Sequence, residues 1–411
     1  MTPYRINAAR LWSDLMTQGA IGALPGGGLD RMALTDGDRD ARGVFAYWCA
    51  QAGLAMSVDG MGNMFARRDG ADNSLPPVML GSHLDTQSPG GKFDGILGVL
   101  AALEVARSLN DAGVVTARPL EVVNWTNEEG ARFSPGLMGS AVFAGTVPLE
   151  VAHASTDRAG LRFGDELRRI RYDGPAVMGG RPVHSYFELH IEQGPLLEEA
   201  GITIGAVTHS HYSISADIEC IGANAHIQSE PMLRRRNALV GVAKLIDAID
   251  QVGRAYAPDG SASAVVVDAW PNNRINIPHR ATLSYGLMHP EEAGMLAMAA
   301  EIEAERARIS AETGLTFNTI VQRRRNPIHF HPEMIALTEA CAQALGLSVQ
   351  RMRTRPGHDA FNMTLLCPTE LIFVPCRDGL SHSELEWCAP EHCEAGANVL
   401  LNAVVERAGR I

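Results

Sequence analysis

The sequence contains no long apolar run and no excess of positive charge. A transmembrane helix needs about 20 consecutive apolar residues, and no stretch of the 411-residue chain reaches this length. The 35 Lys and Arg residues are outnumbered by 47 Asp and Glu residues, which gives a formal net charge of −12. Because nucleic acids bind basic surfaces, we expect neither a nucleic acid nor a membrane as partner. The first residues also lack the pattern of a signal peptide, so we expect a cytoplasmic protein.

Cysteine is scarce as well, and internal repeats are missing. The seven cysteines are an odd number scattered along the chain, which is typical of reduced thiols. Four of them lie near the C-terminal end without the paired CxxC spacing of a zinc–sulfur site: Cys367, Cys376, Cys388 and Cys393. The lack of repeats excludes a solenoid. With 411 residues, 46% of them hydrophobic, the chain is expected to form two globular domains.

Apolar segments of strand and helix length alternate in the first half of the chain. They predict a strand at 77–84, a helix at 96–109, and further strands at 120–126 and 187–191. This alternation is typical of an α/β domain with a mixed, mainly parallel sheet. In such a sheet, binding sites form beyond the carboxyl ends of the strands.

A different pattern begins near residue 212. Strand-like and helix-like segments follow one another in the order β-α-β-β-α-β, which predicts a ferredoxin-like α+β layer: 213–222, 236–252, 263–270, 281–289, 291–313 and 315–322. From residue 332 the chain returns to long helices and buried strands, including 370–375. We therefore predict that residues 212–328 form an inserted domain. Residues 1–211 and 329–411 would together form the catalytic domain.

Side chains that bind metals follow several of the predicted strands. His83 and Asp85 lie two residues apart and face the same side of an extended segment, so one can bind an ion while the other orients it. Asp94 opens a helix, and its two oxygens could bridge two ions. Of the adjacent pair Glu128 and Glu129, one can bind metal while the other serves as a base toward an activated water. These residues, with His190 and His382 further on, predict a metal-dependent hydrolase.

The motifs around these residues also resemble those of a known family. They are, in order, Gly81-Ser-His-Leu-Asp-Thr86, Asp94-Gly95, Asn127-Glu-Glu-Gly-Ala-Arg-Phe133, His190-Ile-Glu-Gln-Gly-Pro195, Gly357-His-Asp-Ala360 and Asp378-Gly-Leu-Ser-His382. Over nearly its whole length the chain is similar to the hydantoinase/carbamoylase amidohydrolases. This group includes N-carbamoyl-L-amino acid hydrolases, β-ureidopropionases and allantoate amidohydrolases. It is a branch of the dinuclear-zinc aminoacylase and carboxypeptidase superfamily.

The resemblance implies a centre of two divalent ions in each subunit. His83 and His190 would bind one ion each, and Asp94 would bridge the two. Glu129 and His382 would complete the pair. Zinc is the favoured metal, and manganese, cobalt and nickel accept the same nitrogen and oxygen donors.

The resemblance also implies roles in catalysis and substrate binding. Glu128 would be the general base, and Asp85 would support His83. The inserted domain would be a lid and dimerisation domain of a homodimer. From it His226 would reach the neighbouring subunit's site and stabilise an oxyanion by about 3 kcal/mol. The residues implied to contact a small amide substrate are Gln193, Asn276, Gly357 and His358.

Three segments depart from the family's pattern. After His226, Ile227 and Gln228 replace small residues, which either reshapes the site or reflects drift in a loop. Met288 stands where members that bind an α-carboxylate usually carry arginine, and a thioether cannot donate a hydrogen bond. Arg355 replaces a small residue in the loop before Gly357. We predict that Arg355 binds the substrate anion instead, with an ordinary surface arginine as the alternative.

These features favour an enzyme that cleaves a linear C–N amide bond of an N-carbamoyl or N-acyl amino acid. One alternative is an aminopeptidase or dipeptidase of the same superfamily, against which the Asn-Glu-Glu-Gly-Ala-Arg-Phe and Asp-Gly-Leu-Ser-His motifs count. A second alternative is a binding protein without activity on the same scaffold. The presence of Glu128 and of all five metal-binding residues argues against that alternative.

Overall fold

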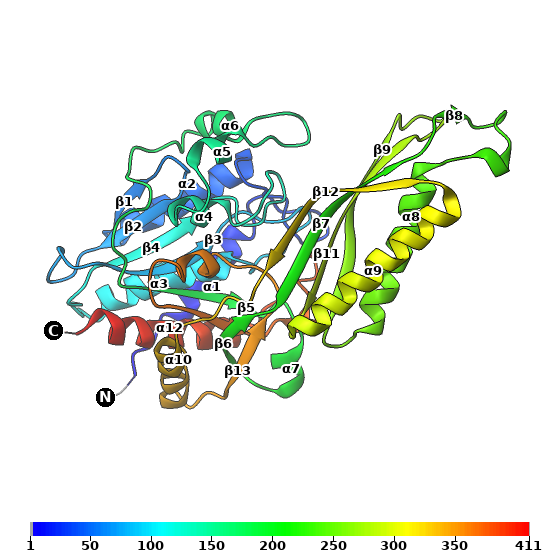
Figure 1. The fold of residues 1–411 in the computed structure, drawn as a ribbon. Coiled ribbons are helices and arrows are strands. Elements are labelled where there is room, and N and C mark those ends of the chain that lie inside the picture. The colour runs from blue at the N-terminus through cyan, green and yellow to red at the C-terminus, as the bar shows by residue number, and fades with distance from the viewer. Residues whose placement is uncertain (1–2, 411) are drawn as a thin grey trace. The chain divides into compact units, whose positions relative to one another are not determined.

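A computed structural model describes residues 3–410 of the chain (Figure 1). The contacts divide it into two compact units, one made of Met1–His209 and His329–Ile411 and the other of Ser210–Ile328. The sequence prediction placed the inserted domain at 212–328. Within the described residues, no helix is long and apolar enough to cross a membrane.

The first unit is built on an eight-stranded sheet with the order β1-β2-β4-β3-β5-β14-β6-β13. Its four central strands run parallel and are buried throughout: β4 (Leu120–Trp125), β3 (Val78–His83), β5 (Ser185–Ile191) and β14 (Thr369–Val374). The outer strands are β1 (Ala55–Val58), β2 (Met64–Arg68), β6 (Ile204–Ser210) and β13 (Val349–Thr354). The antiparallel pairs lie toward the edges, between β1, β2 and β4 and between β14 and β6. The predicted fold class, a mixed and mainly parallel α/β sheet, is confirmed.

Helices bury the apolar strands of this sheet. One cluster of side chains joins the strands to five helices: α1 (Ala8–Gln18), α2 (Asp36–Gln51), α3 (Ile96–Asp111), α10 (Pro332–Ala344) and α12 (Pro390–Ala408). The shorter helices of the unit are α4 (Met138–Phe143), α5 (Leu149–Ala154), α6 (Phe163–Arg169), α7 (Leu196–Ala200), α11 (Ala360–Met363) and the 3-10 turn η2 (Arg377–Gly379). Helix α3 is buried from Ile96 to Leu109 except at Arg107, which explains its composition of Ala, Leu and Val. Its first turn begins directly behind the end of β3.

The second unit has the order β7-α8-β9-β11-α9-β12, with a four-stranded sheet arranged β12-β7-β11-β9. All its strand pairs are antiparallel, which together with this order is the ferredoxin-like arrangement. The elements are β7 (Tyr212–Ile221), α8 (Ala238–Ala255), β9 (Ser261–Trp270), β11 (Arg280–His289), α9 (Glu292–Thr313) and β12 (Thr316–Arg325). The two helices pack on one face of the sheet through alternate residues such as Ile214, Ile218 and Leu283.

A small second sheet in this unit was absent from the sequence prediction. It pairs β8 (Ala225–His226) with β10 (Asn276–Ile277), and the 3-10 turn η1 (Met232–Arg234) follows β8. Strands of two residues leave no periodic signal in a sequence. Their pairing nevertheless matters, because it sets His226 directly opposite Asn276.

Candidate metal centre

The predicted metal-binding side chains of the first unit gather beyond the carboxyl ends of its parallel strands. Strand β3 ends at His83, and His190 lies next to the last residue of β5. Asp94 stands just before α3, so its carboxylate lies at the same end of the sheet. Glu128 and Glu129 follow β4 in a tight turn. The connection of buried strands to short loops thus brings distant parts of the chain together.

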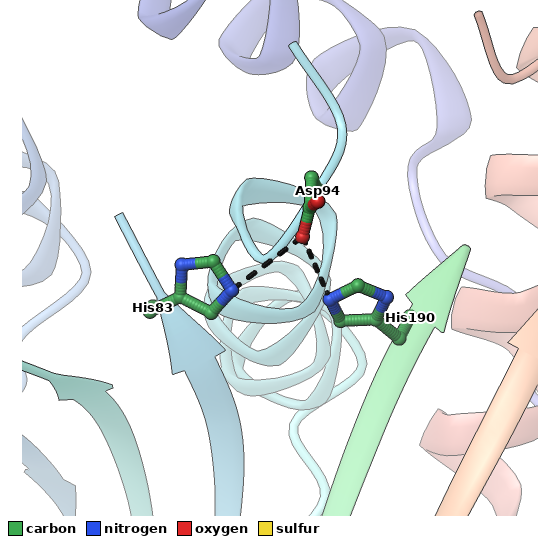
Figure 2. A group of neighbouring side chains, drawn as sticks. All are labelled: His83, Asp94 and His190. Carbon is green, nitrogen blue, oxygen red and sulfur yellow. Dashed lines mark ion pairs between the residues drawn. The ribbon is translucent and has the colours of Figure 1, made fainter. Parts of the chain in front are cut away.

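Two histidines share one oxygen of Asp94 (Figure 2). The Nε2 atoms of His83 and His190 lie 3.6 and 3.1 Å from Asp94 Oδ1, and all three residues are buried. Each ring directs its other nitrogen, Nδ1, to a backbone carbonyl at 2.9 Å, that of Asp85 for His83 and that of Ile191 for His190. A carbonyl can only accept, so Nδ1 carries a proton. Nε2 faces Asp94, and its lone pair becomes available to a metal ion when its own proton is lost. His83 Nε2 is moreover buried without a hydrogen-bond partner, as expected of a metal donor.

The other oxygen of Asp94 faces a second group of donors. His382 Nε2 lies 3.1 Å from Asp94 Oδ2 and 3.2 Å from Glu129 Oε2. Asp94 therefore offers one oxygen to each group, which is the geometry of a bridging carboxylate. Both rings lie on the same side of Asp94, whereas the family resemblance implied that His83 and His190 bind one ion each. The assignment of the donors to individual ions stays a prediction.

The charges of the centre suit divalent cations. Burial by itself would raise the pKa of Asp94, but hydrogen bonds with His190, His382 and His83 hold it well below its usual range. Burial likewise opposes protonation of His382, yet Asp94 and Glu129 raise its pKa to about 11. Carboxylates that favour the protonated form of a neighbouring histidine create a negative electrostatic potential, and the same potential attracts a metal cation. The donor set is thus compatible with divalent metal ions.

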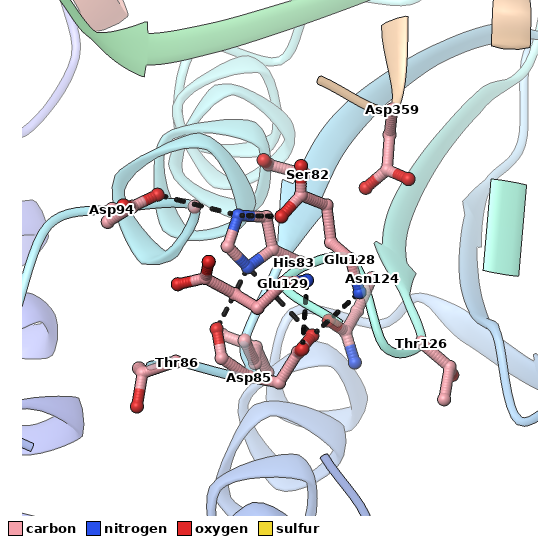
Figure 3. A network of polar contacts seen from close by, with 12 residues as sticks. Ser82, His83, Asp85, Thr86, Asp94, Asn124, Thr126, Glu128, Glu129 and Asp359 are labelled. Carbon is pink, nitrogen blue, oxygen red and sulfur yellow. Dashed lines mark hydrogen bonds and ion pairs between the residues drawn. The ribbon is translucent and has the colours of Figure 1, made fainter. Parts of the chain in front are cut away.

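Glu128 and Asp85 complete the surroundings of His83 (Figure 3). The Oε2 atom of Glu128 lies 3.4 Å from His83 Nε2, and Glu128 is almost fully buried. Burial raises its pKa well above the usual range, although the charge of His83 opposes the shift. The carboxylate of Asp85 accepts the backbone N–H groups of Glu128 and Glu129 at 3.3 Å each. Asp85 thus supports His83 through its carbonyl oxygen and orients the two glutamates through its carboxylate.

Two of the predicted substrate-binding residues lie against this centre. Gln193 Nε2 donates to Asp94 Oδ2 at 2.7 Å. The His358 ring stands edge-on to that of His190 with a centroid distance of 4.6 Å, and its buried Nδ1 has no hydrogen-bond partner. Burial, reinforced by His190, lowers the pKa of His358 well below its usual value, so the ring is neutral. Its unpartnered nitrogen is therefore free to bind another group.

The remaining predicted residues lie elsewhere. Gly357 is half-buried next to His358, and Arg355 is exposed in the same loop. The charge of Arg355 partly offsets the rise that burial causes in the pKa of Glu192. His226 and Asn276 belong to the second unit. There the Nδ1 atom of His226 accepts the backbone N–H of Gln228 at 3.2 Å, which leaves Nε2 as the protonated, donating nitrogen.

Several buried carboxylates around the centre were missed by the sequence analysis. Glu188 accepts hydrogen bonds from Ser82 and from the backbone of Ala360, each at 2.7 Å. Asp359 accepts one from Ser140. Glu188 could have been found, because it lies two residues before His190 and so faces the same side of β5. Glu386 could have been found from its position between the large apolar residues Leu385 and Trp387.

Residues 79–406 match the family described as Peptidase family M20/M25/M40. The chain belongs to this family. The N-carbamoyl-L-amino-acid amidohydrolase of Rhizobium meliloti is 42% identical to it over 98% of this chain and 97% of its own length. The N-carbamoyl-L-amino acid amidohydrolase of Geobacillus stearothermophilus is 34% identical over 97% and 98%.

Solved structures agree with this membership of the M20/M25/M40 family. An amidase of the hydantoinase/carbamoylase family from Burkholderia vietnamiensis superposes with a TM-score of 0.94 at 44% sequence identity, covering 99% of each chain. The resemblance found from the motifs is thereby confirmed. The expected class, a hydrolase acting on C–N amide bonds, is confirmed with it.

Proposed function

We propose that this member of the M20/M25/M40 family is a dinuclear metal-dependent amidohydrolase. Its substrate would be a linear amide of the N-carbamoyl or N-acyl amino acid type. The observation that carries the proposal is the carboxylate of Asp94, which offers one oxygen to His83 and His190 and the other to Glu129 and His382. The relatives named as N-carbamoyl-L-amino-acid amidohydrolases support the substrate class.

The two groups of donors would each hold one divalent ion. His83, His190 and Asp94 would bind the buried ion, and Asp94, Glu129 and His382 the second. Zinc suits these nitrogen and oxygen donors best, and manganese, cobalt or nickel would also fit. When bound, such ions make a water acidic and polarise a carbonyl oxygen.

Glu128 would move the proton in this reaction. Its carboxylate lies beside His83 Nε2 but belongs to neither group of donors, so it is free to act as a base. It would take a proton from the attacking water as the new C–O bond forms. The same proton would then pass to the nitrogen as the C–N bond breaks. Its burial and raised pKa match this double role as base and acid.

Substrate contacts would come from both units. In the first unit, Gln193, Gly357 and the unpartnered nitrogen of His358 would face the amide. In the second, His226 would donate from Nε2 to the developing oxyanion in a neighbouring subunit, with Asn276 beside it. The homodimer and the lid role of the second unit stay predictions from the family resemblance.

Hydrolysis of a matched panel of amides, followed by mass spectrometry, tests this function. The panel pairs N-carbamoyl and N-acyl amino acids with analogues whose α-carboxylate is masked as an amide, and adds dipeptides. We expect the metal-loaded protein to cleave those substrates whose α-carboxylate is free. Faster cleavage of dipeptides would favour a peptidase instead. Equal cleavage of the masked analogues would contradict an amino acid derivative as substrate.

The same panel tests anion binding by Arg355. Because Met288 cannot donate to a carboxylate, the guanidinium of Arg355 would supply a bidentate contact. Replacing Arg355 by Ala should raise KM about tenfold or more for acidic substrates only. The control is Arg351→Ala, which removes an exposed arginine of β13 that pairs with Glu339 of α10. An equal rise in KM for neutral amides would contradict this role.

A further inference from the structure

We propose that Glu386 is a positioning residue for the metal centre, which it serves by fixing the bridging Asp94 in place. The inference rests on the dinuclear centre proposed above. Glu386 lies in the segment between η2 and α12, four residues after His382. It belongs to neither group of metal donors, and its carboxylate acts through the backbone that carries Asp94.

One oxygen of Glu386 holds the start of helix α3. Its Oε1 atom accepts the backbone N–H of Phe93 at 2.8 Å and that of Asp94 at 3.1 Å. Both residues lie in the loop directly before Gly95, the N-cap of α3, and α3 has no side-chain cap of its own. A carboxylate from a distant segment therefore fixes the loop that leads into α3, and one of its two donors is the backbone of Asp94, whose side chain lies between the two donor groups.

The other oxygen of Glu386 ties the same residue to His382. The hydroxyl of Ser381 lies 2.9 Å from Glu386 Oε2 and 2.9 Å from Asp94 Oδ2. Ser381 is the neighbour of His382, so this link fixes a histidine donor and the bridging carboxylate relative to each other. Gln193 Nε2 donates both to Asp94 Oδ2 and to the Ser381 oxygen, at 2.7 and 3.1 Å.

The surroundings of Glu386 leave it little room to move. The residue is 4% exposed. A Cβ atom added at Gly91 would lie 1.9 Å from its carboxyl carbon, so only glycine there admits the carboxylate. The rings of Trp12, Phe93 and Trp387 pack against one another, edge-on or stacked, with centroid distances of 5.5 to 6.0 Å. Two of these residues adjoin Glu386, because Phe93 donates its backbone N–H to it and Trp387 follows it in the chain. A buried carboxylate is costly unless it is well hydrogen-bonded, which suggests that its placement serves the centre.

The proposal predicts a loss of metal affinity. Asp94 is shared by both donor groups, so a shift of its backbone disturbs two ions at once. Partners that orient metal ligands typically contribute a factor of about 10 to 100 in affinity. Glu386→Ala should therefore bind Zn²⁺ about 10- to 100-fold more weakly than the wild-type protein.

The experiment is a Zn²⁺ titration of the full-length apoprotein against a chromophoric chelator, with no substrate present. Glu386→Gln should restore affinity to within about fivefold of wild type, since an amide oxygen can accept the same two N–H groups and its NH2 can donate to Ser381. Glu384→Ala removes an exposed carboxylate from the same segment and should bind as wild type does. Circular dichroism of each apoprotein establishes that it is folded.

A second route does not depend on the stability of Glu386→Ala. Gly91→Ala should weaken Zn²⁺ binding because its methyl group displaces the Glu386 carboxyl, and combining it with Glu386→Ala should add little. The inference about Glu386 is wrong if folded Glu386→Ala or Gly91→Ala binds Zn²⁺ with wild-type affinity, or if the losses of affinity add up in the double variant. Either result would leave the proposed function standing. A wild-type protein that binds no ion would overturn the proposed function together with the inference.

Discussion

Replacing Glu128 by Gln is expected to lower kcat about 10²- to 10⁴-fold while the metal content stays at the wild-type level. The amide keeps the shape of the side chain but cannot accept the proton of the attacking water. Since Glu128 lies outside both groups of donors, the ions should remain bound. Steady-state kinetics together with elemental analysis of the purified protein measure both quantities.

The neighbouring residue provides the matched control for this variant. Glu129→Gln changes the next side chain in the same turn, but Glu129 belongs to the donor group of Asp94 and His382. We expect this variant to lose metal first and activity as a consequence. Near-normal kcat in Glu128→Gln would disprove its role as a base. Loss of metal from that variant would instead make Glu128 a ligand.

Gly95→Ala should destroy the donor group of His83, Asp94 and His190. Gly95 has φ +67°, and a Cβ atom added there would lie 2.3 Å from the Cε1 and Nε2 atoms of the His83 ring. The ring must leave its place, and with it the nitrogen that faces Asp94. We expect a metal stoichiometry reduced by one ion or more and a fall in kcat/KM of more than about 100-fold.

Gly113→Ala is the control that distinguishes the steric clash with His83 from strain of a left-handed backbone. Gly113 lies at the other end of the same helix, α3, with φ +61° and open space around the position of an added Cβ atom. The Gly113→Ala protein should be about 1 to 2 kcal/mol less stable, because alanine is strained in the left-handed conformation. It should keep its metal and its activity. Thermal unfolding and metal analysis of both variants make the comparison. Equal metal contents in the two variants would contradict the steric argument.

The sequence allowed the central strands to be predicted, together with the side chains that the structure brings together around Asp94. Strands β3, β4 and β5 are buried along their whole length and are therefore rich in apolar residues, and such segments stand out in a sequence. His83 and the Glu128–Glu129 pair follow such runs directly. The family motifs supplied His382, which lies further beyond the predicted strand at 370–375, and the expected substrate contact of Gln193.

The grouping of these side chains around Asp94 could not be predicted. It depends on which oxygen of Asp94 each ring faces, and that is decided by side-chain rotamers and by the loop before α3. The role of the Asp85 carbonyl was equally hidden, because residue spacing says nothing of backbone acceptors. Glu386 was missed because the backbone groups that it accepts from lie far away in the sequence, with Phe93 at a separation of 293 positions.

The end of strand β12 differs from the prediction for a physical reason. The sequence placed it at Gln322, yet the strand continues to Arg325 and pairs Arg323 with Ser215 of β7. Strand β12 lies at the edge of its sheet, where exposed charged side chains are tolerated and discourage pairing with other chains. Charge alone is therefore a poor sign that an edge strand has ended.

The two groups of donors differ in their access to solvent. His83 and His190 are buried, whereas the side chain of His382 is 47% exposed. An ion held through His382 would thus exchange with the medium faster than its neighbour. In a cell short of metal, such a protein would pass through a form that holds only the buried ion. Its activity would then follow the supply of the more exposed ion.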